Sequence, residues 1–163
     1  MTIELSWPRY LCLAGLATTA VLTALAPASS AGLSWPTLAL FWAIHVFGAL
    51  AALSLAQLAV GRTPRLAELH GVWQVGVSGV VGAAFFAPVA MGLDAAFGPF
   101  GLEMEDEGPL ALQLVDEFAA LAPPVAILWL LINAPRLIMI EVAGAAEDEA
   151  PAPPPPADED AAA

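Results

Sequence analysis

Residues 72–93 read VWQVGVSGVVGAAFFAPVAMGL and contain no charged side chain. About 18 or more consecutive apolar residues are enough to cross the hydrocarbon core of a bilayer as one helix. Three more long apolar stretches lie at about residues 10–28, 36–60 and 110–140. The sequence therefore predicts an all-α integral membrane protein. Residues 1–143 form a four-helix transmembrane bundle, and residues 144–163, rich in Pro and acidic side chains, form a disordered tail.

The overall composition excludes several classes of protein. Of 163 residues, 60% are hydrophobic and 12% are charged, whereas soluble domains carry about a quarter charged residues. The four basic residues are all arginines, and the net charge is −12. No patch of these residues can neutralise a phosphate backbone, so we expect no direct contact with nucleic acid. The partners expected are the lipid bilayer and a second membrane protein or a second copy of the chain.

The first span has two interpretations. Arg9 before an apolar run, with small residues around Ala24 and Ala26, is typical of a cleavable signal peptide. Glu4 and the length of the run favour an uncleaved helix instead. We expect the uncleaved helix.

The fourth span contains Pro123 and Pro124 and is preceded closely by Asp116 and Glu117. One interpretation is a single helix with a kink at the proline pair, which is then a candidate hinge. The other is a short helix at residues 110–121 followed by a second helix from Pro124. We favour the single helix, because Pro124 to Pro135 is too short to cross a bilayer.

The arginines predict the orientation of the bundle. Four alternating crossings bring Arg9, Arg62, Arg65 and Arg136 to the same side, and arginine-rich loops stay in the cytoplasm. We therefore expect a multi-pass protein of a bacterial inner membrane with both termini cytoplasmic. Aromatic residues near the span ends are typical of interfacial anchors: Trp7, Tyr10, Trp35 and Trp73.

A few polar residues inside the spans are the candidates for function, because polar groups are costly in hydrocarbon. His45 and the pair Asp116 and Glu117 lie at similar predicted depths, roughly 10–13 Å below the outer boundary. A contact between them is either a structural ion pair or a proton-linked switch. Asn133 is expected to bond a neighbouring helix, or to relay motion to the tail. Asp94 is expected to cap span three and begin an acidic outer loop.

No sequence motif of an enzyme is present: the chain contains no GxSxG, HExxH or Walker sequence. His70, the only other histidine, is predicted at the opposite membrane face from His45, so the two cannot share a haem or a metal. We expect no enzyme activity, no cofactor and no metal site. Small residues four apart predict close helix packing, within the chain or in a dimer: Ser78 and Gly82, Gly79 and Ala83, Gly48 and Ala52, and Gly15 and Thr19.

Several span-end motifs are similar to one known family. They are Trp7-Pro8-Arg9-Tyr10, Pro36-x-Leu38-Ala39-x-Phe41-Trp42, Phe85-Phe86-Ala87-Pro88 with Gly92-Leu93-Asp94, Asp116-Glu117-Phe118 with Pro123-Pro124-Val125, and Asn133-Ala134-Pro135-Arg136-Leu137. Together they resemble the N-terminal membrane region of proteobacterial LytTR-type transcriptional regulators. In that family four helices precede a cytoplasmic DNA-binding domain, and no such domain follows Leu137 in this sequence.

The resemblance implies a sensory or anchoring module that signals from the envelope to the cytoplasm in transcription regulation. Two other hypotheses remain. One is a structural accessory subunit of a larger membrane complex, which the small-residue faces favour. The other is a small proton-linked transporter that uses His45, Asp116 and Glu117.

Overall fold

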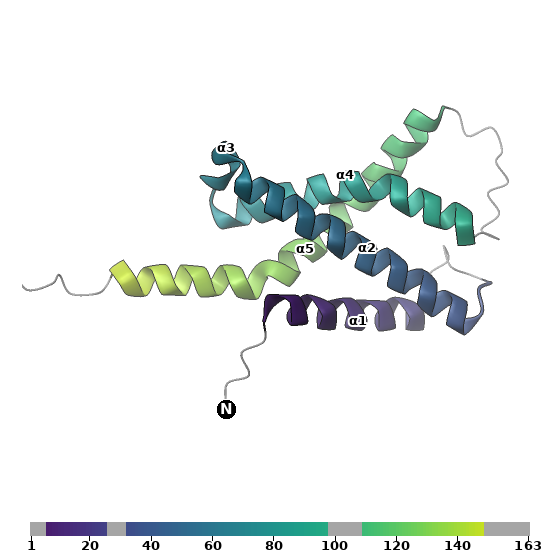
Figure 1. The fold of residues 1–163 in the computed structure, drawn as a ribbon, viewed down its shortest axis with the longest axis horizontal. Helices are drawn as coiled ribbons and strands as arrows, with labels where there is room; N and C mark the ends of the chain where they lie inside the picture. The colour runs from purple at the N-terminus through teal and green to yellow at the C-terminus, as the bar shows by residue number, and fades with distance from the viewer. Residues whose placement is uncertain (1–5, 26–31, 98–108, 149–163) are drawn as a thin grey trace, which may run out of the picture.

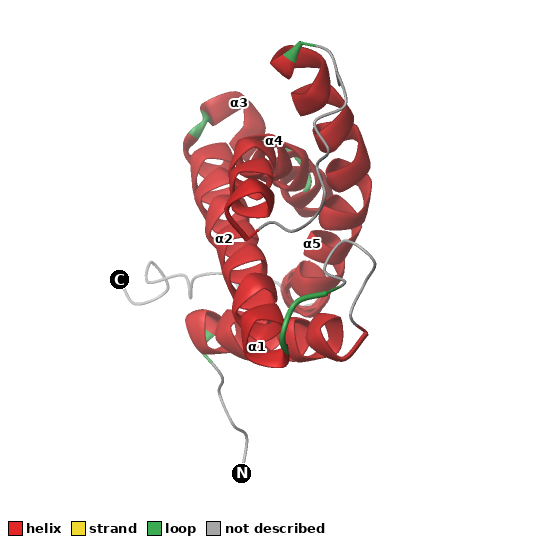
Figure 2. Cartoon of the chain, turned by 90° about the vertical axis from the view of Figure 1, so that its right-hand side faces the viewer, coloured by secondary structure: helices red, strands yellow, loops and turns green. Residues whose placement is uncertain are grey.

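The structure is a computed structural model that describes residues 6–25, 32–97 and 109–148. Its helices are α1 (Trp7–Leu25), α2 (Trp35–Arg62), α3 (Pro64–Ala67), α4 (Gly71–Phe97) and α5 (Leu110–Asp148) (Figure 1). Four of them are long and apolar enough to cross a membrane. Within the described ranges the chain has helices and loops and no strand (Figure 2). The predicted all-α, four-span architecture is confirmed.

The helix limits differ from the predicted spans in two informative places. Helix α3 is a single turn that the sequence did not predict; it begins with Pro64, whose fixed φ suits the first helical position. Helix α4 continues to Phe97, four residues beyond the predicted end at Leu93. Ala95 and Ala96, both good helix formers, carry the helix past Asp94. Asp94 is therefore a helical residue and does not begin a loop. The other acidic residues of the predicted outer loop lie outside the described residues.

Helix α4 is the centre of the bundle, because it packs against both α2 and α5, whereas α1 packs mainly on α2. Two glycines of α4 make this possible. A Cβ atom on Gly82 would lie 2.8 Å from the backbone Cα of Leu53 in α2. A Cβ atom on Gly79 would lie 3.2 Å from the Cα of Ala126 in α5. The small residues of span three thus serve packing within the chain, as their spacing predicts.

The buried core contains a polar chain between α4 and α5. Trp129 and Asn133 are both fully buried. The indole Nε1–H of Trp129 donates to the Oγ of Ser78 at 3.0 Å, and the Ser78 hydroxyl donates to the carbonyl oxygen of Val75 at 2.8 Å. Asn133 was expected to bond another helix, but its Nδ2 donates to the Trp129 carbonyl one turn back, at 2.9 Å. Its Oδ1 has no hydrogen-bond partner among the described residues. The interhelical bond predicted for Asn133 is therefore wrong, and Trp129 makes that connection.

Helix α5 is one continuous helix through Pro123, Pro124 and Pro135, as the single-helix interpretation predicts. Its axis changes direction along its length, and its last turns extend beyond the other helices (Figure 1). Prolines are the usual cause of such bends. The described helix extends to Asp148, so residues 144–148, which were predicted to belong to the disordered tail, are helical. The alanines that precede Glu147 favour this extension. The rest of the predicted tail lies outside the described residues.

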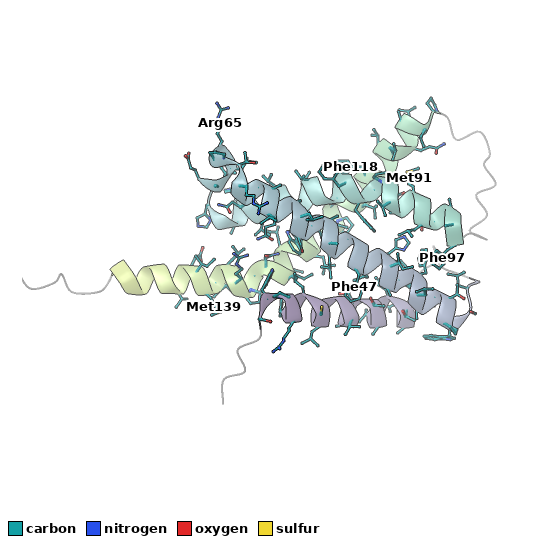
Figure 3. All side chains as sticks on the ribbon, in the orientation of Figure 1. Phe47, Arg65, Met91, Phe97, Phe118 and Met139 are labelled. Atoms are coloured by element: carbon teal, nitrogen blue, oxygen red, sulfur yellow. The ribbon has the colours of Figure 1, made fainter. Side chains whose placement is uncertain are left out.

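The bundle has two chemically different ends. Arg62 and Arg136 line one cavity together with Trp7 and Pro8, and Arg9 and Arg65 lie at the same end of the bundle. Figure 3 shows Arg65 there, on the turn formed by α3, with Phe97 toward the other end. We call these the arginine end and the Asp94 end. The structure therefore gathers the four predicted topology anchors at one end, as the alternating crossings require.

Candidate functional site

The candidate site lies on α2, near the Asp94 end, around the imidazole of His45. The side chain is 12% exposed. Its Nδ1 lies 2.9 Å from the carbonyl oxygen of Phe41, one turn earlier on the same helix. Aromatic rings surround it: those of Phe41 and Trp42 have centroids 4.1 and 5.9 Å away, and that of Phe86 on α4 lies edge-on at 6.2 Å. The imidazole is thus held in one orientation by its own helix and by rings from two helices.

The acidic partner of His45 is Asp94 on α4. The His45 Nε2 and the Asp94 Oδ1 are 3.3 Å apart. The Asp94 side chain is 39% exposed, so the pair is partly covered. Near it, the rings of Phe41 and Phe97 pack edge-to-face at 5.5 Å and join the same two helices. The sequence did not predict this pair, because Asp94 was assigned to a loop. The signal was present in Ala95-Ala96-Phe97, an apolar continuation of the span.

The geometry fixes how many protons the pair needs. A backbone carbonyl only accepts hydrogen bonds, so Nδ1 of His45 must carry a proton to bond Phe41. The contact between Nε2 and Asp94 then requires a second proton. That proton lies either on the imidazole, giving imidazolium and carboxylate, or on the carboxylic acid beside a neutral imidazole. If it leaves, an imidazole lone pair faces a carboxylate oxygen. A proton shared by these two groups would therefore favour the contact between α2 and α4 at this level.

The two carboxylates predicted to meet His45 behave differently. Glu117 on α5 is partly buried and interacts electrostatically with both Asp94 and His45. Asp116, its neighbour, is exposed. Successive residues on a helix point about 100° apart, so only one of the two can face the bundle. His45 therefore makes its direct acidic contact with Asp94 on α4 and not with span four as predicted, and Glu117 interacts with His45 through charge alone.

An apolar cavity of about 160 Å³ opens beside His45, between α1, α2, α4 and α5. An engineered cavity of similar size in another protein is large enough to bind benzene. His45 is the titratable group on its wall. The remaining wall consists mainly of aliphatic and aromatic side chains: Leu22, Trp42, Val46, Leu50, Phe86, Val125 and Trp129 among them. A small apolar molecule in this cavity would lie against the imidazole and its aromatic neighbours.

The second histidine lies elsewhere. His70 is exposed and its Nε2 lies 3.7 Å from the Oε1 of Glu141, an equally exposed residue of α5. This pair is at the arginine end, as predicted for His70, so the two histidines belong to different sites. Across the described ranges no three His, Cys, Asp or Glu side chains form a group that could hold a metal ion.

Comparisons with known proteins give no relative: no protein-family model, no curated protein and no solved structure matches this chain.

Proposed function

We propose that this chain is a membrane-embedded sensory module of a LytTR-like regulatory system. It lies in a bacterial inner membrane, with the arginine end in the cytoplasm and the Asp94 end toward the envelope. One observation carries the proposal: the contact between His45 and Asp94 stands beside an apolar cavity and within electrostatic reach of Glu117 on α5. The resemblance of the span-end motifs supplies the regulatory context.

Helix α5 supplies the route for a signal. It carries Glu117 near the Asp94 end and continues without interruption to Asp148. At 1.5 Å per residue this length is roughly 45 Å, more than the hydrocarbon thickness of about 30 Å. Pro123 and Pro124 lie between the two ends and are the proposed hinge. A change in charge at the Asp94 end therefore acts on a helix that leaves the bundle on the other side.

The proposed stimulus is a change in proton or ligand occupancy at His45. Loss of the shared proton replaces an attraction between α2 and α4 with a repulsion, and a molecule in the cavity changes the surroundings of the same imidazole. Either event changes the populations of two arrangements of the helices only if it stabilises one arrangement more than the other. DNA binding is not assigned to these residues, because their four arginines are too few to neutralise a phosphate backbone.

The test is transcriptional. A strain that lacks the chain is complemented with the wild-type sequence, with His45→Ala, with Pro123→Ala and Pro124→Ala combined, or with Asp116→Asn. Immunoblots of membrane fractions confirm equal amounts, and transcripts are compared at two external pH values. We expect a defined set of transcripts to change on deletion and to return with wild type and with the exposed-site control Asp116→Asn. His45→Ala and the proline variant should fail to restore it.

Two results would count against the proposal. The first is a deletion strain with an unchanged transcriptome. The second is full restoration by His45→Ala. If the chain instead purifies in fixed stoichiometry with another membrane protein and transcripts stay constant, a structural accessory role replaces the sensory one. Proton flux in liposomes that is lost in His45→Ala, with constant transcripts, would indicate a transporter.

A further inference from the structure

A large open cavity whose wall includes two arginines lies at the arginine end, far from His45. Its volume is about 610 Å³, and residues of α1, α2, α4 and α5 form its wall. The wall combines two arginines, three uncharged polar residues and several apolar ones: Arg62, Arg136, Ser54, Gln57, Gln74, Trp7, Pro8, Leu11, Leu58 and Gly61. The four spanning helices therefore converge on this one cavity.

Two positive charges line the cavity. Arg62 comes from α2 and Arg136 from α5, and no described carboxylate lies within ion-pair distance of either guanidinium. The guanidinium carbon of Arg136 lies 5.7 Å from the ring centroid of Trp7, a cation–π contact that restrains it. Because both arginines line the same space, an anion in it is attracted by both of them. Guanidinium groups bind phosphate and carboxylate oxygens through paired hydrogen bonds, and phosphate is the group that membrane phospholipids carry.

The uncharged polar groups hold the wall in place. The Gln74 amide donates from Nε2 to the carbonyl oxygens of Ala67 and Leu69, at 2.9 and 2.8 Å, which ties α4 to the turn at α3. The Ser54 hydroxyl donates to the Leu50 carbonyl at 2.7 Å. Their donors are therefore occupied within the protein. Among the side chains of the wall, the donors that remain for an anion are those of Arg62, Arg136 and Gln57 and the indole Nε1–H of Trp7.

The apolar part of the wall distinguishes a lipid from a soluble phosphate. Leu11, Leu58 and Trp7 line the same cavity as the arginines. The cavity lies at the ends of the membrane-spanning helices, where headgroups lie and where basic pockets between helices bind anionic lipids. A phospholipid can place its phosphate between the arginines while its glycerol and first methylenes contact these apolar side chains. A free phosphate ion would leave the apolar wall without a partner.

We propose that this cavity binds the phosphate of an anionic phospholipid from the leaflet at the arginine end. The lipid bridges Arg62 on α2 and Arg136 on α5 beside Trp7 of α1. It therefore links the peripheral first helix and the long fifth helix to the rest of the bundle. The proposal does not depend on the sensory function, since it rests on the cavity and its charge alone.

The experiment measures lipid binding to the purified full chain in detergent by native mass spectrometry. Phosphatidylglycerol and phosphatidylcholine with identical acyl chains are titrated separately. We expect phosphatidylglycerol to bind about ten-fold more tightly or better, because the choline cation of phosphatidylcholine offsets the charge of its phosphate and is repelled by the two arginines, whereas phosphatidylglycerol keeps a net negative charge. Arg62→Gln and Arg136→Gln, singly and together, should reduce this preference to about two-fold in the double variant. Arg65→Gln removes the same charge from the same end, outside the cavity, and should retain it.

Three outcomes would overturn the proposal: equal binding of both lipids to wild type, an equal loss in Arg65→Gln, or displacement of the lipid by millimolar inorganic phosphate. The second result would assign the preference to surface charge, and the third would assign the cavity to a soluble anion. Thermal unfolding of every variant without lipid is the folding control. Arg62 and Arg136 are exposed, so the single variants should fold even if the double variant does not.

Discussion

Helices α4 and α1 are both long and apolar, yet they hold different positions in the bundle. Helix α4 contacts two long neighbours, and its buried residues are mostly small: Val75, Ser78, Gly79, Gly82, Ala83, Phe86, Ala87 and Ala90. Helix α1 has only Gly15 and Thr23 buried, and it exposes Leu13, Leu16, Val21 and Leu25. Both α4 and α1 are hydrophobic enough and long enough to cross a membrane. What makes α4 central is a stripe of small residues that lets two other backbones approach it.

The comparison implies a hierarchy of stability. Helices α2, α4 and α5 form a core in which backbone meets backbone, and α1 lies on the outside against side chains of α2. Changes in the small residues of α4 should therefore cost much more than the same changes in α1. Three substitutions test this difference, and the unfolding of the purified chain in mixed micelles can measure each of them.

The largest effect is expected for Gly82→Ala. The new Cβ would lie 2.8 Å from the Cα of Leu53, and a backbone cannot move aside as a side chain can. We expect α2 and α4 to separate and the free energy of unfolding to fall by about 2–3 kcal/mol. The matched control is Gly76→Ala on the same helix, where a Cβ meets nothing within 4 Å. It should change stability by less than about 1 kcal/mol. Similar values for both variants would contradict the packing described for α4.

The sequence predicted the four spans and the packing residues of α4 well. The apolar runs identified all four spans, and the four-residue spacing identified Gly79 and Gly82 as packing residues. It could not say which helix each glycine faces, because spacing carries no information about the partner. The same limit explains Asn133: its type predicts a hydrogen bond, but its position next to Trp129 on the helix decides with which group.

The sequence predicted part of the candidate site, and the polarity of each residue relative to its surroundings explains which part. His45 and Glu117 stood out because they are polar residues in apolar runs. Asp94 did not, because it falls at the edge of its run, where a loop and a last helical turn look alike in sequence. The cavity beside His45 and the one between Arg62 and Arg136 were not predictable, since each is formed by residues from four separate helices.

An intermediate effect is expected at the contact of α4 with α5. Trp129→Phe removes the indole donor that bonds Ser78 at 3.0 Å and leaves a small cavity in the core. We expect a loss of about 1–2 kcal/mol. Ser78→Ala removes the acceptor, and the double variant completes a thermodynamic cycle. The coupling should be about 1 kcal/mol. Trp73→Phe is the control, because Trp73 is 68% exposed. A coupling near zero would mean that the bond does not hold α4 and α5 together.

The smallest effect is expected for Gly15→Ala on α1, although the distances look similar. The new Cβ would lie 2.9 Å from Cε1 of Phe47 and 3.0 Å from Cδ1 of Leu50. Both are ends of flexible side chains, and Phe47 is exposed, so its ring can turn toward the lipid at little cost. We expect a loss of less than about 1 kcal/mol, partly offset by the better helix propensity of alanine. The same micelle unfolding gives the value. If Gly15→Ala destabilises the chain as much as Gly82→Ala, α1 belongs to the core, and the distinction between backbone contact and side-chain contact does not explain which helix is central.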